Sequence, residues 1–118
     1  MDSPLKIFGA KAAIPIRYEG DIHTLGAKLS KGLMIPDFNI SPREYPPHGI
    51  QGTAETLGWE MWLERIETRD EYKYSLRMET EDSFEEIRRN QMHDISPWLA
   101  RFVTKICKLD ARPASEKP

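Results

Sequence analysis

Few side chains in this 118-residue sequence have the type and spacing to carry out chemistry. His48 lies in a proline-rich stretch, with a carboxylate on either side at Glu44 and Glu55. A histidine within hydrogen-bond reach of a carboxylate can act in general acid–base catalysis. The spacing of these residues does not require such a pair, and a histidine next to proline in a turn is commonly only solvated. We therefore expect no catalytic residues and no enzymatic activity.

The sequence also lacks the groupings that hold metals and cofactors. The three histidines, His23, His48 and His93, are scattered, and neither H-x-x-x-H nor C-x-x-C occurs. The single cysteine, Cys107, falls within an amphipathic segment and is most simply a small core residue. Neither G-x-G-x-x-G nor G-x-x-x-x-G-K-[ST], the phosphate-binding patterns, is present. We expect no metal site and no cofactor.

Two segments with apolar residues at alternate positions dominate the centre of the chain. Residues 57–66 and 71–79 follow this period of two, which is typical of strands with one buried face. The short polar stretch between them suits a hairpin loop. The buried side of the predicted hairpin consists of Leu57, Trp59, Met61, Leu63, Tyr72, Tyr74, Leu76 and Met78.

The opposite side of this hairpin is charged and holds one large aromatic residue. It carries Glu60, Trp62 and Glu64 on the first strand and Lys73 and Arg77 on the second. Pairs of opposite charge across the strands would help to fix their register. A tryptophan on this side is either covered by a helix or loop, or exposed so that a partner protein can bind to it. The second alternative is considered because tryptophan is enriched at binding hot spots. Glu60, Trp62 and Glu64 are our first candidates for partner binding.

The irregular stretch 41–52 is the second candidate surface. Its three prolines and two glycines exclude regular structure, and the prolines stiffen the loop. Functional residues are often carried on loops that a rigid scaffold holds in place. Tyr45 and His48 are therefore the second choice for partner binding. The alternative function, a small enzyme or ligand-binding domain, would place its pocket around His48.

Helical spacing of apolar residues predicts three helices, at about 22–31, 84–93 and 97–109. Asp21 is suited to cap the first of them, and Gly32 to follow its end. Ser96 is suited to cap the last helix, with a proline at its first position. We expect the buried stripe of that helix to be Trp98, Leu99, Phe102, Val103 and Ile106.

Shorter strands are predicted near 5–8, 14–18 and 36–40. Pro15 favours an edge or the start of a strand, because proline cannot donate to a ladder. A central hairpin with one helix before it and two after it indicates an α+β fold, with helices on one face of an antiparallel sheet. We expect a single domain over residues 1–110 and a flexible tail over 111–118.

The formal net charge is only −2, but it is unevenly distributed. Residues 55–86 hold eleven Asp and Glu against four Lys and Arg, a net of −7. Phosphates would be repelled by this acidic middle, so we expect no nucleic-acid partner for the hairpin face. A basic protein partner, steered by charge, is compatible with it. The alternative is an ordinary solvated acidic face.

The sequence also bears on location. No apolar run approaches the length that crosses a membrane, and the N-terminus lacks the pattern of a signal peptide. One cysteine cannot form an internal disulfide, which suits a reducing compartment. We expect a cytoplasmic protein without a membrane partner.

Three stretches carry a resemblance to a known class of proteins. They are the run 29–38 (LSKGLMIPDF), the Pro46-Pro47-His48 turn and the run 57–64 (LGWEMWLE). Over residues 20–80 the chain resembles the immunity proteins of bacterial toxin systems, with contact-dependent growth inhibition as the nearest example. The resemblance implies a protein that binds a cognate toxin domain and blocks its active site. An acidic patch would suit a toxin that acts on RNA or DNA, because such toxins carry basic clefts.

A third function class stays open beside the inhibitor and the ligand-binding domain. A structural or accessory subunit of a larger assembly would associate through an exposed apolar patch.

Overall fold

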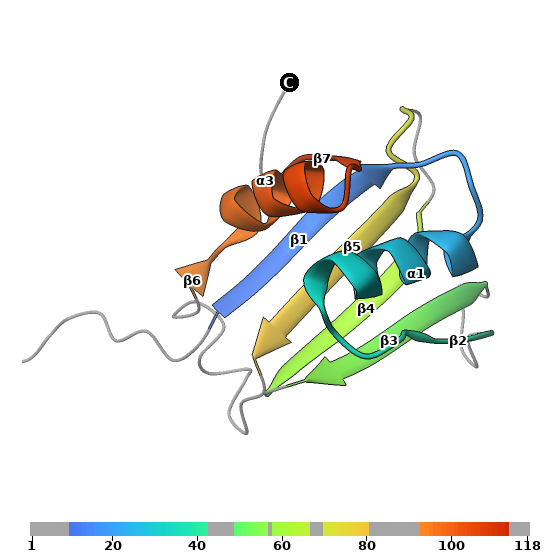
Figure 1. Ribbon diagram of the computed structural model, residues 1–118, viewed down its shortest axis with the longest axis horizontal. Coiled ribbons are helices and arrows are strands. Elements are labelled where there is room, and N and C mark those ends of the chain that lie inside the picture. The colour runs from blue at the N-terminus through green and yellow to red at the C-terminus, as the bar shows by residue number, and fades with distance from the viewer. Residues whose placement is uncertain (1–9, 43–48, 57, 67–69, 81–92, 114–118) are drawn as a thin grey trace, which may run out of the picture.

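The computed structural model describes residues 10–42, 49–56, 58–66, 70–80 and 93–113. Within these ranges the chain forms one sheet with two helices on it (Figure 1). This confirms the α+β class and the mainly antiparallel sheet. The strands are β1 (Ala10–Arg17), β2 (Asn39–Pro42), β3 (Ile50–Thr56), β4 (Trp59–Arg65), β5 (Tyr74–Thr80), β6 (His93–Asp94) and β7 (Asp110–Ala111), and the helices are α1 (Ile22–Leu33) and α3 (Ser96–Ile106).

The strands follow the spatial order β2-β3-β4-β5-β1-β6, with β7 also pairing with β1. Neighbouring strands are antiparallel, except that the short β6 runs parallel to β1. The predicted hairpin is confirmed, since β4 pairs with β5 and places Leu63 opposite Leu76 and Met61 opposite Met78. The period of two therefore led to the correct faces in both strands. Tyr72 is the exception, because it precedes β5 and its hydroxyl reaches Asp110 instead of the core.

Both helices lie on the same side of the sheet, in front of the strands in Figure 1. α3 packs on β1 and β7, and α1 packs on β3 and β4. The core between the layers is built from aliphatic side chains, each of which contributes roughly 1.5–3 kcal/mol by its burial. The most deeply buried are Ile14, Ile16, Leu25, Leu29, Met61, Leu63, Leu76, Leu99 and Val103.

Helix α1 begins as predicted and ends differently. The Asp21 carboxylate accepts a hydrogen bond from the backbone N–H of Thr24 at 2.8 Å, which lowers the pKa of Asp21. The predicted stop at Gly32 is wrong, because the helix continues to Leu33 and Met34 takes the left-handed conformation with φ 58°. Gly32 lies against Cys107, the residue that follows α3, and any Cβ at Gly32 would overlap the sulfur. The glycine is therefore required for close packing of the two helices.

Helix α3 differs from the prediction in its cap and in its buried side. Ser96 does not cap the helix with its side chain; its hydroxyl and its N–H both donate to the Asp94 carboxylate, at 2.6 and 2.9 Å. The same hydroxyl oxygen accepts the N–H of Ala13 at 2.9 Å, which ties the helix to β1. The predicted burial of Trp98 and Ile106 is wrong, since these side chains are 53% and 52% exposed.

The sequence of α3 offers two neighbouring apolar stripes, and packing selects one of them. Leu99, Ala100 and Val103 face the sheet, and Cys107 follows on the same side. The ring of Trp98 stacks instead on Phe102, with their centroids 5.3 Å apart. Cys107 is buried, as predicted for a small core residue.

Pro15 lies in the interior of β1 and not at its start. β1 pairs with β5 along one side, but no described strand pairs with its other side at Pro15, which is therefore a local edge. Its missing N–H costs no bond to β5, because Lys11 O, Ala13 N and Pro15 O all bond toward the β6–β7 side. The proline occupies the gap between these two short strands. Its carbonyl accepts the N–H of Arg112 at 3.1 Å.

Several other boundaries differ from those predicted. The strand near 36–40 begins only at Asn39, and the stretch 41–52 contains the end of β2 and the start of β3. β7 spans Asp110–Ala111, at the predicted end of the domain, and the extent of the domain and of the tail stays a prediction. The strand near 5–8 and nearly all of the helix at 84–93 lie outside the described residues, and His93 is part of β6.

Candidate protein-binding face

The side of the sheet opposite the helices carries the strand residues that alternate with the core, and we call it the open face. Leu63 contacts α1 from one side of β4, so its neighbours Trp62 and Glu64 point the other way. Neither α1 nor α3 lies on this side. The principal side chains of the open face are Lys11, Thr53, Glu55, Glu60, Trp62, Glu64, Arg77 and Glu79.

The first-choice candidates Glu60, Trp62 and Glu64 therefore lie together on one strand of the open face. The second-choice candidates Tyr45 and His48 fall outside the described ranges. The sequence left two interpretations of Trp62, a covered residue or an exposed anchor. Neither described helix covers it, and its side chain is partly buried by its strand neighbours.

Arg77 holds the indole of Trp62 in place. The two residues are directly opposite in the β4–β5 pairing, and the guanidinium carbon lies 4.7 Å from the centroid of the indole. Such a cation–π contact contributes roughly 0.5–1 kcal/mol at an exposed site. Arg77 also forms an ion pair with Glu64 at 3.8 Å. The aromatic residue at the centre of the open face is thus held in a defined orientation by contacts within the sheet.

A row of glutamates crosses the open face next to Trp62, and we call it the acidic row. Glu55 of β3 is opposite Glu60 of β4, which is opposite Glu79 of β5. The row ends at Lys11 of β1, opposite Glu79. Like charges directly opposite each other destabilise a sheet. The predicted pairing of hairpin glutamates with Arg77 is found for Glu64, whereas Glu60 faces a second and a third carboxylate.

Two hollows flank the pair formed by Trp62 and Arg77. The larger, of about 520 Å³, lies toward β2 and β3, and Trp62, Glu55 and Glu60 form part of its wall. The smaller, of about 330 Å³, lies on the Arg77 side and includes Asp94. The remaining residues of the larger hollow are Asp37, Asn39, Thr53, Ala54 and Met61, and those of the smaller are Lys11, Ala12, Ala13, Glu79 and Ser96.

Sequence reasoning missed the contribution of β3 to this face. Its inward residues are Gly52 and Ala54, so the strand lacks the alternating large apolar residues that mark β4 and β5. The missing volume comes from the preceding segment, because a Cβ at Gly52 would lie 3.2 Å from Ile40 and 3.3 Å from Phe38. A glycine and an alanine two residues apart beside a turn were the only available signal.

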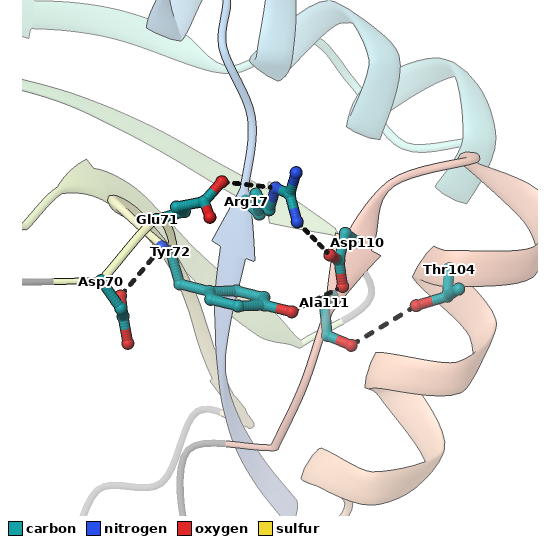
Figure 2. A network of polar contacts seen from close by, with 7 residues as sticks. All are labelled: Arg17, Asp70, Glu71, Tyr72, Thr104, Asp110 and Ala111. Atoms are coloured by element: carbon teal, nitrogen blue, oxygen red, sulfur yellow. Dashed lines mark hydrogen bonds and ion pairs between the residues drawn. The ribbon is translucent and has the colours of Figure 1, made fainter.

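In a second charged region, at the opposite end of β5, the charged side chains pair with one another (Figure 2). The Tyr72 hydroxyl donates to Asp110 at 2.8 Å, and this bond raises the pKa of Tyr72. Arg17 lies 3.2 Å from the Glu71 carboxylate and 3.7 Å from that of Asp110. These contacts connect the segment before β5 with the end of β1 and with β7.

Arg112 completes this region, which we call the Tyr72 network. Its guanidinium pairs with Asp70 at 2.6 Å and lies 4.3 Å from the centroid of the Tyr72 ring. Asp70 also accepts the backbone N–H of Tyr72 at 2.9 Å. Each carboxylate of the network therefore has a cationic or hydroxyl partner within the chain.

Catalytic chemistry finds little support among the described side chains. Burial raises the pKa of the Cys107 thiol, which keeps it protonated and poorly nucleophilic. Glu55 is exposed on the open face, and its proposed partner His48 lies outside the described ranges. In the part of the chain that the structure describes, no group of three or more His, Cys, Asp or Glu side chains could hold a metal ion.

Comparison with known proteins adds no family to this geometry. No protein-family model matches the chain, and no curated protein matches it. Neither helix among the described residues is long and apolar enough to cross a membrane. The resemblance to immunity proteins therefore stays a prediction.

Proposed function

We propose that this chain is a non-enzymatic inhibitor that docks a partner protein on the open face and occludes the partner's active site. The expected partner is a cognate bacterial toxin domain, as the resemblance to immunity proteins implies. The observation that carries this proposal is Trp62, an aromatic residue held by Arg77 at the centre of a sheet face on which no described helix lies.

The dimensions of the open face suit a protein partner better than a small molecule. Four neighbouring strands, β3, β4, β5 and β1, at about 4.8 Å spacing, with seven or eight residues each at roughly 3.3 Å, give a face about 19 by 23 Å across. This is of the same order as the roughly 800 Å² that each partner contributes to a typical interface. The hollows on the face are shallow and open to solvent, whereas ligand pockets are enclosed.

Trp62 has the properties of a binding hot spot. Tryptophan supplies a large contact area, and its fixed orientation lowers the entropy cost of docking. The paired charges of Arg77 and Glu64 beside it can form the polar surroundings that exclude water from such an anchor. Truncation of an anchor of this kind typically costs 2 kcal/mol or more, which is roughly thirtyfold in affinity.

The test is a capture experiment with three tagged forms of the protein in extracts of the native host. Trp62→Ala removes the proposed anchor, and Trp98→Ala is a matched control that removes an exposed tryptophan from the opposite side of the sheet. We expect the wild type and Trp98→Ala to recover the same exported protein through its C-terminal domain. Trp62→Ala should bind that domain at least roughly thirtyfold more weakly.

Occlusion is then tested on the recovered domain itself. Wild-type protein should abolish its activity at equimolar concentration, and Trp62→Ala should not. Circular dichroism of each variant confirms that the fold survives. If Trp62→Ala captures and inhibits like the wild type, the open face is not the docking surface. If Trp98→Ala alone loses the partner, the helical side of the molecule takes that role.

A further inference from the structure

The acidic row contains a charge imbalance that the described part of the chain does not resolve. Glu55 and Glu60 are directly opposite each other on β3 and β4. No hydrogen bond or ion pair joins either carboxylate to another residue of the described ranges. The nearest guanidinium on the face, that of Arg77, is engaged with Trp62 and Glu64. These two glutamates therefore disfavour folding slightly and stabilise no contact among the described residues.

We propose that the partner's contacting surface is basic and places an arginine or lysine side chain in the larger hollow, between Glu55, Glu60 and Trp62. This inference rests on the proposed function, because it names the chemistry of the group that the same face receives. Asp37 lies on the rim of this hollow and adds a third carboxylate from a different segment of the chain. Neutral groups at the hollow are Asn39 and Thr53.

The geometry of the hollow suits a guanidinium in particular. A planar guanidinium can donate to a carboxylate in a bidentate manner while its flat side rests on an aromatic ring. Arg77 already makes the ring contact with Trp62, at 4.7 Å from the centroid of the indole. The volume of about 520 Å³ is ample for one long side chain and its water. An anionic group would instead face three carboxylates, and none of the described residues that line the hollow is a lysine or an arginine.

The partner class follows from this chemistry. Surfaces rich in arginine and lysine are those with which proteins hold the phosphates of nucleic acids. In the acidic row, carboxylates on neighbouring strands are about 4.8 Å apart at the backbone, against about 3.4 Å per phosphate along one DNA strand. The row thus presents negative charge at a density comparable to that of a nucleic-acid strand.

The experiment is a titration of the whole protein with two probe peptides, followed by backbone amide NMR. One peptide contains three arginines in a Gly–Ser background, and the other replaces each arginine with its neutral isostere citrulline. We expect the arginine peptide to shift the amides of residues 53–62. A charge contact at about 4 Å in water corresponds to about fivefold in affinity, so citrulline should bind at least that much more weakly.

Two variants locate the effect. The double variant Glu55→Gln/Glu60→Gln should weaken the arginine peptide at least fivefold, as each lost charge contact predicts. Glu71→Gln is the matched control, because it removes one glutamate charge from the Tyr72 network at the far end of β5. It should leave the titration unchanged. Equal binding of both peptides, or shifts that map to the Tyr72 network, would overturn the inference.

The same variants separate this inference from the proposed function. If Trp62→Ala loses the captured partner while Glu55→Gln/Glu60→Gln retains wild-type affinity for it, docking on the open face holds and the basic contact is wrong. If the arginine peptide binds between Glu55 and Glu60 while the wild type captures no partner, the charge specificity holds and the proposed inhibitor role is wrong.

Discussion

The Tyr72 network and the acidic row are both exposed and charged, yet they are organised in opposite ways. In the network, Arg17 lies between Glu71 and Asp110, and Arg112 pairs with Asp70. In the acidic row, glutamates oppose glutamates across three strands. Charges that are paired within the chain stabilise the fold. Like charges that face each other, as Glu55 and Glu60 do, cost stability.

Among substitutions that distinguish paired carboxylates from those that face each other, we expect the largest change in the free energy of unfolding at Asp94. It borders the smaller hollow of the open face, but it accepts two hydrogen bonds from Ser96. Asp94 should therefore stabilise the fold, as the carboxylates of the Tyr72 network do. Asp94→Asn should lower the free energy of unfolding by about 1.5 kcal/mol, the lower end for hydrogen bonds to a charged group, because the carboxylate is exposed.

The pH dependence of the Asp94 contribution has a definite sign. The hydrogen bonds from Ser96 lower the pKa of Asp94 in the folded state. Its contribution is therefore fully present above the ordinary aspartate pKa of about 3.9 and is lost as the pH falls through the depressed folded value. Urea unfolding of the wild type and Asp94→Asn between pH 2 and 7 measures this. A difference that is as large at the lowest pH as at neutrality would contradict the assignment.

Charge reversal in the acidic row should change binding and stability in opposite directions. Glu60→Arg places a cation between Glu55 and Glu79, so the free energy of unfolding should rise by a few tenths of a kcal/mol. Affinity for the captured partner should fall about tenfold or more, since an attraction becomes a repulsion. Calorimetric titration and thermal unfolding of the same sample provide both values. A loss of both stability and affinity would place Glu60 with the structural carboxylates.

Removal of one hydroxyl from the Tyr72 network should affect stability alone. Tyr72→Phe loses the bond to Asp110, which should cost about 0.5 kcal/mol, because a surface hydrogen bond lies at the low end of the usual range. The raised pKa of Tyr72 means that this contribution is present at neutral pH and is lost as the pH rises through the folded value, above about 10. Unfolding of both forms at pH 7 and pH 11 tests it. Partner affinity should stay at the wild-type value.

The smallest expected effect is an increase in the free energy of unfolding. Glu60→Gln removes one of two directly opposed charges, so the protein should become more stable by about 0.2–0.5 kcal/mol at low salt. Salt screens repulsion between exposed charges, so the difference should shrink as sodium chloride is raised toward 1 M. Parallel denaturant curves at both salt concentrations provide the comparison. A destabilised variant would indicate that Glu60 has a structural partner.

The strongly patterned parts of the fold could be predicted from the sequence. Alternation in 57–66 and 71–79 determined which side of β4 carries Trp62, and Asp21 marked the start of α1, because one short polar side chain satisfies the first N–H groups of a helix. Features that depend on packing between distant segments could not be predicted. Gly32 looked like a helix stop, although its reason is the sulfur of Cys107 more than seventy residues away.

The part of the candidate site that lies on one strand could be predicted, and the part that depends on contacts between strands could not. Glu60, Trp62 and Glu64 share a strand, so local alternation brings them together. The opposition of Glu55 and Glu60 depends on the register of two strands around the turn at Gly58, which has a φ of 83°. The stripe of α3 was misjudged because Trp98 and Leu99 are adjacent apolar residues, and only contact with the sheet decides which one is buried.

The contact between Gly32 and Cys107 makes the only thiol of the protein a kinetic reporter. An alkylating reagent can reach this sulfur only when the helices separate, so its labelling rate measures how often that layer opens. A ligand that binds the native state and not the opened form lowers the population of opened forms by the factor 1 + [L]/Kd. When separation of the helices also disrupts the sheet, the docking of a partner on the open face slows alkylation on the opposite side, without any label at the interface.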